Sequence, residues 1–522
     1  MGNKDKNIVT KNQQLWLFVI ALFAASFVLR LLFSFLSGQP TLMAYPDEVR
    51  YLHIARSIAE EGQILVMGMP TQFQKILYPL FVSPAFLIAD TTLLQLNIIR
   101  IINCFIMSST VIPTMLLARR LTSNDKTIIL SLLIAATLPD MAYTAIFMSE
   151  VLFMPLVVWL FFVASLVMSE QKPTKRVVLS ALYGLVVYLV YLTKEIGAAF
   201  LIASVALFIF EAVRDKQCRK LNGLSIIASL TTFFVAFTAL KITLFQGMGN
   251  TYGESSGFDQ VSLSALTSPY SFFYLGYSAL VLLVAVVMSF YVLPVFVPMY
   301  CFRAINRENR NIFLLAIFTL IVMIGAISYT ISIREDLGSL VPRIHIRYIT
   351  PIVVPLIILC LDALSSSAII KTSKRFKTVF LAAFAVYCVV TALLIPYLSP
   401  KDAVVDHFSM QSIYLIDVLL FPYSPNSASF QILWLLFKAV ILIFAIVAIR
   451  CLMQASKQAS KQASKQASKQ ASKQTSKQAS RLLSWCSFSF SLSMFWTIWR
   501  LTKSFALRTP LPSFVIIKPF LQ

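Results

Sequence analysis

Long apolar segments constrain this chain more than any other feature of its sequence. Many stretches approach the 20 or so residues that an α-helix needs to cross a bilayer, and short polar loops separate them. Hydrophobic residues make up 58% of the chain and the mean hydropathy is +0.80, which excludes a soluble domain of this length. A membrane β-barrel would show short segments of alternating polarity instead. The sequence therefore predicts an all-α polytopic membrane protein.

We expect about twelve transmembrane helices. The first apolar segment is too long for the core of a signal peptide, so we expect it to be a retained helix. The segment 74–90 is apolar but short and contains two prolines, so we expect a juxtamembrane or re-entrant helix there. Apolar residues at helical spacing predict a surface helix over 47–61. The expected spans are 14–36, 94–118, 127–146, 150–168, 177–193, 196–213, 222–245, 271–301, 311–332, 348–365, 378–397 and 431–450.

Lys and Arg are distributed unequally between alternate loops. If the N-terminus is cytoplasmic, the cytoplasmic segments hold 20 Lys or Arg and the opposite loops hold eight. This bias predicts that orientation and places the first long loop, 37–93, on the outer side. The formal charge of +22 then reflects topology, and no nucleic-acid partner is predicted. The seven cysteines form no CxxC or metal-ligand spacing, so neither a disulfide framework nor a zinc site is indicated.

Ionisable and aromatic residues gather on this outer side. Ionisable groups at membrane depth are costly and usually face a cavity or each other, so we expect a shared site. A carboxylate there can take a proton from a hydroxyl, and Arg and Lys can hold a phosphate, which favours transfer of a group from a lipid-linked phosphate. Helix capping is the alternative for the two acidic residues after Pro46. The candidates are Asp47, Glu48, Arg50, Tyr51, Lys75, Asp140, Glu150, Lys194, Glu195, Arg343, His345, Arg347 and Tyr348.

The order of motifs over residues 14–365 resembles the polytopic glycosyltransferases of the C-type fold (GT-C). That group includes protein O-mannosyltransferases and the transferases that add aminoarabinose to lipid A. The matching elements are Asp-Glu-x-Arg-Tyr at 47–51, Phe-Gln-Lys at 73–75, Leu-Ala-Arg-Arg-Leu at 117–121, Leu-Pro-Asp at 138–140, Ser-Glu at 149–150 and Arg-Tyr-x-x-Pro at 347–351.

The resemblance implies a polyprenyl-phosphate sugar donor, undecaprenyl phosphate in a bacterium, and inversion at the anomeric carbon. Asp47 would be the catalytic base or would orient the acceptor, with Glu48 supporting it. The residues implied to hold the donor phosphate are Lys75, Lys194, Arg343 and Arg347. Those implied to support the site or the acceptor are Arg50, Tyr51, Asp140, Glu150, Glu195, His345 and Tyr348.

Two departures leave the acceptor open among lipopolysaccharide, another glycan and a protein. Residues 74–77 read Gln-Lys-Ile-Leu where the aminoarabinose branch carries Glu-Lys-Pro-Pro, and no large outer domain follows the last expected spans. Some members of the wider fold hold a divalent ion, but this chain has no His-rich or Asp-x-Asp ligand set. No metal or other cofactor is therefore predicted.

The resulting prediction is a multi-pass protein of a bacterial inner membrane, with a membrane-embedded transferase domain over 1–450 and a periplasmic active site. A lipid-linked sugar transporter or flippase is one alternative, but it would be expected to show an internal repeat and mid-membrane charges in broken helices. A polysaccharide polymerase or ligase is a second alternative. Such an enzyme would be expected to carry its key functional residues in a large outer loop near the C-terminal end of the chain.

The C-terminal part is a low-complexity tail, 451–481, followed by an apolar and basic end, 482–522. Residues 454–480 repeat Lys-Gln-Ala-Ser, with Thr475 in place of one Ala. A polar repeat of this kind buries nothing and predicts no catalytic role. The DNA repeat AAGC would encode it, and slippage in such a tract shifts the reading frame. We therefore expect a phase-variable gene, and read 482–499 either as a further span or as the product of one frame.

Overall fold

The computed structural model describes residues 3–36, 46–71, 73–138, 143–244, 269–289, 292–334 and 346–365, with isolated positions between 378 and 443. Within these ranges the chain is helical, apart from short turns and one hairpin of β1 (Leu65–Val66) and β2 (Met69–Pro70). Seven of the described helices are long and apolar enough to cross a membrane. The protein is thus a polytopic helical membrane protein, as the hydropathy predicts.

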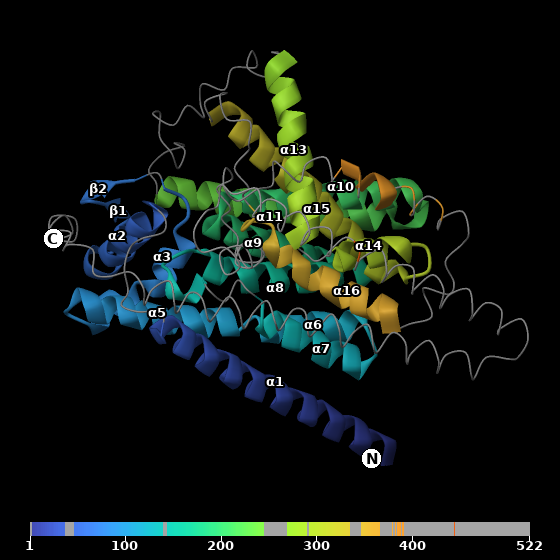
Figure 1. Ribbon diagram of the computed structural model, residues 1–522, viewed down its shortest axis with the longest axis horizontal. Helices are drawn as coiled ribbons and strands as arrows, with labels where there is room; N and C mark the ends of the chain where they lie inside the picture. Colours follow the sequence, from blue (N-terminus) through green and yellow to red (C-terminus); the bar gives the residue numbers. More distant parts are fainter. Residues whose placement is uncertain are drawn as a thin grey trace, which may run out of the picture.

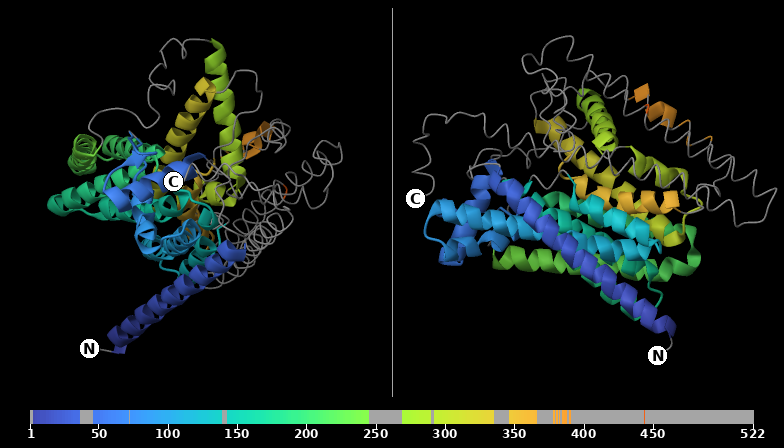
Figure 2. Two further views of the ribbon diagram at one scale, coloured as in Figure 1. Left: turned by 90° about the vertical axis from the view of Figure 1, so that its left-hand side faces the viewer. Right: turned by 60° about the horizontal axis from the view of Figure 1, so that its bottom comes forward.

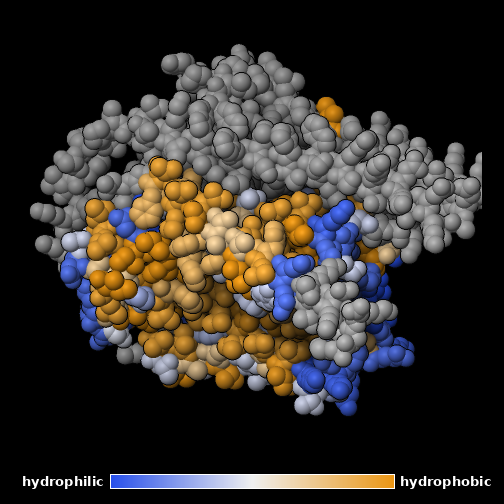
Figure 3. Space-filling model, turned by 90° about the horizontal axis from the view of Figure 1, so that it is seen from below, coloured by the Kyte–Doolittle hydropathy of each residue, from blue (hydrophilic) through white to orange (hydrophobic). Residues whose placement is uncertain are grey.

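Most long helices run along the longest axis of the molecule (Figure 1). Seen from below, the surface is a broad hydrophobic area with hydrophilic residues toward its two ends (Figure 3). This is the distribution that a bilayer requires of helices that span it. The spanning helices are α1 (Asn3–Leu36), α5 (Thr92–Ser108) continued by α6 (Val111–Leu121), α8 (Glu150–Ser169), α9 (Pro173–Thr193), α10 (Ala198–Arg214), α11 (Arg219–Thr243) and α15 (Arg307–Arg334).

Three of the spans expected from the sequence differ from the helices in the structure. The span expected at 127–146 is the shorter α7 (Asp125–Ala136), because a proline at 139 disfavours helical backbone at the residue before it. The span expected at 271–301 is broken into α13 (Pro269–Ser289) and α14 (Leu293–Tyr300), with Val292 at φ 65° and Pro294 unable to continue a helix.

The third, expected at 348–365, is a 3₁₀ turn, η5 (Thr350–Ile352), leading into α16 (Val353–Ser365), which is shorter than a full span. The spans expected at 378–397 and 431–450, apart from isolated positions, and the tail domains at 451–481 and 482–522 lie outside the described residues.

The first long loop is folded onto one end of the helix bundle. The expected surface helix is α2 (Pro46–Glu61), and the short apolar segment forms two juxtamembrane helices, α3 (Leu77–Val82) and α4 (Pro84–Ile88), as predicted. Contacts of α2 with β1, α3 and α4, of α4 with α5 and of α3 with α9 fix this loop on the bundle. Figure 1 shows it at the left end, opposite the N-terminus.

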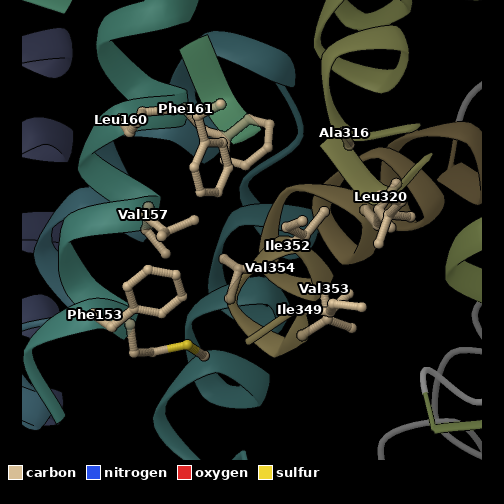
Figure 4. Packing of buried hydrophobic residues seen from close by; sticks show 14 of the residues in the cluster. Phe153, Val157, Leu160, Phe161, Ala316, Leu320, Ile349, Ile352, Val353 and Val354 are labelled. Carbon is tan, nitrogen blue, oxygen red and sulfur yellow. The ribbon is translucent and has the colours of Figure 1, made fainter. Parts of the chain in front are cut away.

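Helix α8 lies at the centre of the bundle and contacts α5, α6, α9 and α15. On one side Phe153, Val157 and Phe161 face Ile352 and Val354, all of them buried (Figure 4). On the opposite flank of the molecule α1 crosses α5, α6 and α7 obliquely (Figure 2). This packing holds the first residue of α8, Glu150, at the end of the bundle that carries α2.

Candidate functional site

The first turn of α2 presents Asp47 toward a lysine from the segment before α3. Pro46 begins the helix, and Asp47 follows in the first turn, where the helix dipole favours a negative charge. Its Oδ2 lies 3.4 Å from Lys75 Nζ, and its Oδ1 lies 3.9 Å from Arg50 Nη1. Lys75 is buried, and its ammonium also lies over the ring of Phe73, 4.9 Å from the centroid.

A second group of charges joins three elements that are far apart in the sequence. Glu150 Oε1 accepts a hydrogen bond of 2.7 Å from Lys194 Nζ, and Arg347 Nε lies 3.4 Å from the same oxygen. Lys194 directly follows the last residue of α9, and Arg347 lies in the turn before η5, which packs on α8. The Lys194 ammonium sits 4.1 Å from the ring centroid of Tyr348, whose hydroxyl accepts a 3.0 Å hydrogen bond from Arg347 Nη2.

Electrostatics link the two groups into one site. Burial alone would raise the pKa of Asp47, but the positive charges of Lys75, Lys194 and Arg347 outweigh that effect and hold the pKa below its ordinary value. Asp47 is therefore ionised at neutral pH and can accept a hydrogen bond or a proton. Three cations within reach of one carboxylate provide what is needed to hold a phosphate next to a hydroxyl that loses its proton.

Tyr51 and Glu48 secure the segment that precedes Glu150. The Tyr51 hydroxyl is 3.0 Å from Ser149 Oγ, and its ring packs edge-on against Phe73 and Tyr78. Burial raises the pKa of Tyr51, so its hydroxyl stays protonated. Glu48 is fully buried, and its Oε2 lies 3.4 Å from the amide nitrogen of Phe147, which donates to it. These contacts tie the start of α2 to the start of α8.

The structure brings together eight of the predicted residues, whereas Glu48, expected to support Asp47, accepts from the Phe147 amide. Glu195, in η2 (Glu195–Gly197), interacts electrostatically with Lys241 of α11 and Tyr191 of α9. Asp140, Arg343 and His345 lie outside the described residues, so their expected roles remain predictions. The eight that share the site, either directly or by one contact, are Asp47, Arg50, Tyr51, Lys75, Glu150, Lys194, Arg347 and Tyr348.

Two supporting contacts were not predicted from the sequence. The Tyr191 hydroxyl lies 2.6 Å from Gln74 Oε1, to which it donates. The Tyr78 hydroxyl donates to Asn103 Oδ1 at 3.1 Å, and Asn103 in turn donates to the Ile146 carbonyl. The available signal was the position of the polar Gln74 directly beside the predicted Lys75.

The described residues do not fit a metal site. No three His, Cys, Asp or Glu side chains among them come close enough together to share an ion. The two carboxylates that face the site, Asp47 and Glu150, are both engaged by Lys or Arg nitrogens. We therefore derive no step that uses a metal.

Comparison with known proteins finds similarity at the level of three-dimensional structure. No protein-family model and no curated protein matches the sequence. ArnT from Cupriavidus metallidurans, in the apo state, aligns with 92% of this chain and 77% of its own at 16% identity and a TM-score of 0.43. The same protein bound to undecaprenyl phosphate aligns with 93% and 77% at 15% identity and a TM-score of 0.45.

The archaeal oligosaccharyltransferase AglB from Archaeoglobus fulgidus, in complex with an inhibitory peptide and a dolichol-phosphate, is also similar. It aligns with 80% of this chain and 59% of its own, at 12% identity and a TM-score of 0.39. All three alignments have low sequence identity, and the side chains of the site are the basis of the function proposed below.

Proposed function

We propose that this chain is an integral-membrane glycosyltransferase that moves a sugar from a polyprenyl-phosphate donor to an acceptor of the cell envelope. The observation that supports it best is the ionised Asp47, which lies beside Lys75 and within the field of Lys194 and Arg347 at one end of the bundle. A base next to several cations fits a hydroxyl acceptor and a phosphate leaving group. The membrane surface suits a donor and an acceptor that are themselves held in the membrane.

The proposed reaction is a single displacement with inversion. The acceptor hydroxyl oxygen forms a bond to the anomeric carbon while the bond from that carbon to the phosphate oxygen breaks. The electron pair of the broken bond stays on the polyprenyl phosphate, and Asp47 takes the hydroxyl proton. Lys75, Lys194 and Arg347 stabilise the charge that develops on the phosphate, which is where electrostatic stabilisation contributes most.

The acceptor is an envelope glycolipid, glycan or protein, and the excess of Lys and Arg in the alternate loops favours a periplasmic site in a bacterial inner membrane. Mass spectrometry of envelope glycolipids and glycoproteins can identify it in three strains: wild type, deletion, and deletion complemented with Asp47→Asn. We expect one sugar mass to disappear on deletion and to stay absent with Asp47→Asn expressed at the wild-type level. Restoration of that sugar by Asp47→Asn would show that Asp47 is structural.

We also propose that the gene is phase-variable. A tandem tetranucleotide encodes the same cyclic tetrapeptide in all three frames, so slippage leaves the Lys-Gln-Ala-Ser repeat readable. Thr475 fits this origin, because one base change converts an Ala codon to a Thr codon. Slippage would then leave residues 1–453 unchanged, change the length of the repeat and replace the sequence after it.

Sequencing the tract in single colonies tests this second proposal. We expect near-uniform AAGC units whose number differs between colonies, and C-terminal peptides from more than one frame. Mixed synonymous codons with a constant length would contradict it.

A further inference from the structure

Glu150 binds both phosphate-side cations with a single oxygen atom. Its Oε1 is 2.7 Å from Lys194 Nζ and 3.4 Å from Arg347 Nε, and all three residues are at most 6% exposed. Its Oε2 is buried and has no hydrogen-bond partner among the residues that the structure describes. A buried carboxylate placed in this way lowers the net positive charge that the two cations offer to an anion.

The proposed reaction increases the negative charge on the lipid. A polyprenyl-phosphate sugar is a phosphodiester with one negative charge. The product is a phosphate monoester, which carries about −1.5 to −2 at neutral pH because its second pKa is about 6. Cations that hold the donor therefore hold the product more strongly, and an enzyme with this site must still release the product.

Among the residues that the structure describes, the positive and negative charges of the site balance the single negative charge of the donor. Lys75, Lys194 and Arg347 are positive, and Asp47 and Glu150 are negative, which leaves one net positive charge. Glu48 and Arg50, the other charged residues in the first turn of α2, contribute one charge of each sign. Once Asp47 has passed on the proton that it takes, the site with Glu150 again carries one net positive charge. Without Glu150 it would carry two, which matches the product better than the donor.

We propose that Glu150 is a positioning residue that limits the affinity of this site for the polyprenyl phosphate product, so that the product can leave. The inference rests on the proposed function and deepens it. A purely structural role predicts the opposite effect on binding, because loss of a structural contact would weaken the site.

Glu150→Gln removes the charge and nearly preserves the shape. Coulomb interactions over a few ångströms near a protein surface are large enough that we expect the Kd for undecaprenyl phosphate to fall on the order of tenfold. Because release of the polyprenyl phosphate product becomes slower, we expect the KM for the donor and kcat to fall together. Added undecaprenyl phosphate should also inhibit the variant more strongly than the wild type.

Two further variants complete the design. Glu60→Gln removes a charge of the same sign from α2, where Glu60 pairs with Arg56 at 2.8 Å on the exposed surface, and it should leave the Kd unchanged. The double variant Glu150→Gln with Lys194→Gln restores the net charge and removes the buried pair as a unit. It should return the Kd toward the wild-type value, and it provides a folded protein if the single variant does not fold.

Binding is measured on purified full-length protein in nanodiscs, with undecaprenyl phosphate as the probe and undecaprenol as the uncharged control. Tighter binding by Glu150→Gln, or, where that variant does not fold, a near-wild-type Kd for the double variant, supports the inference. Unchanged or weaker binding by folded Glu150→Gln overturns it while the proposed function stands. If the wild type binds undecaprenyl phosphate no better than undecaprenol, the proposed function and the inference both fail.

Discussion

At the residue scale, the candidate site is centred on Asp47 and Lys75, whose side chains pair at 3.4 Å in the first long loop. Both stand out in the sequence because charged residues are scarce, at 13% of the chain. The pairing of Glu150 with Lys194 and Arg347 could not be predicted, since it depends on how α8, α9 and η5 pack. For the same reason Glu48, expected to support Asp47, was not expected to bind the backbone of Phe147.

The electrostatic coupling of Lys75 to Asp47 predicts a shift in pH dependence. The proposed mechanism uses Asp47 as the ionised base, so we expect activity to be lost as the pH falls through its lowered pKa. Lys75→Met removes the nearest positive charge, so the pKa of Asp47 rises and the acid limb of kcat/KM against pH moves to higher pH. A pH–rate profile of both proteins measures this shift.

Arg50→Gln is the control for that experiment. Arg50 is 3.9 Å from Asp47 and its side chain is 47% exposed, so solvent screens the interaction and the acid limb should move little. An acid limb that stays in place in Lys75→Met would show that another group controls the profile.

At the scale of elements, apolar length and proline positions account for what could be predicted. Spans such as α8, α9 and α15 follow directly from uninterrupted apolar sequence. The break between α13 and α14 combines Pro294 with a positive φ at Val292. The proline can be read from the sequence, but the backbone conformation of Val292 cannot, so the break was missed. The short α7 was missed because the apolar character continues beyond the point at which the helix ends.

The contact between α9 and α11 predicts a sharp difference between two glycines. A Cβ added to Gly184 on α9 would lie 2.4 Å from the carbonyl oxygen of Ser229 on α11, whereas one added to Gly223 meets nothing within 4 Å. Small residues allow membrane helices to approach closely, and Ser229 Oγ also donates to the Ser180 carbonyl across this interface.

We expect Gly184→Ala to destabilise the protein by about 1–3 kcal/mol through overpacking. Gly223→Ala should be neutral or stabilise the helix by up to about 1 kcal/mol, because Ala has the higher helix propensity. Thermal unfolding of both variants in the same detergent gives the comparison. Equal stability of the two would mean that α9 and α11 do not pack as described.

At the scale of the whole molecule, the charge bias predicts which end faces the periplasm. The end that carries α2 holds few Lys and Arg, and the opposite end carries ion pairs such as Arg120 with Glu308 and Arg307 with Glu211. Glu61, the last residue of α2, and Gln171, between α8 and α9, are both exposed and lie at opposite ends.

Labelling with a membrane-impermeant maleimide tests this orientation. In a background whose seven cysteines are replaced by serine, we expect Glu61→Cys to react in intact spheroplasts. Gln171→Cys should react only after the membrane is permeabilised. The reverse pattern would place the site on the cytoplasmic side.

The most direct test of the central claim is a transfer assay with purified protein in proteoliposomes. Polyprenyl-phosphate sugar is the donor, an envelope extract supplies acceptors, and released polyprenyl phosphate is measured for the wild type and Asp47→Asn. The account predicts acceptor-dependent release by the wild type and a loss of at least about a hundredfold in Asp47→Asn, the contribution typical of a general base. Movement of intact donor across the bilayer without release, or full activity in Asp47→Asn, would contradict it.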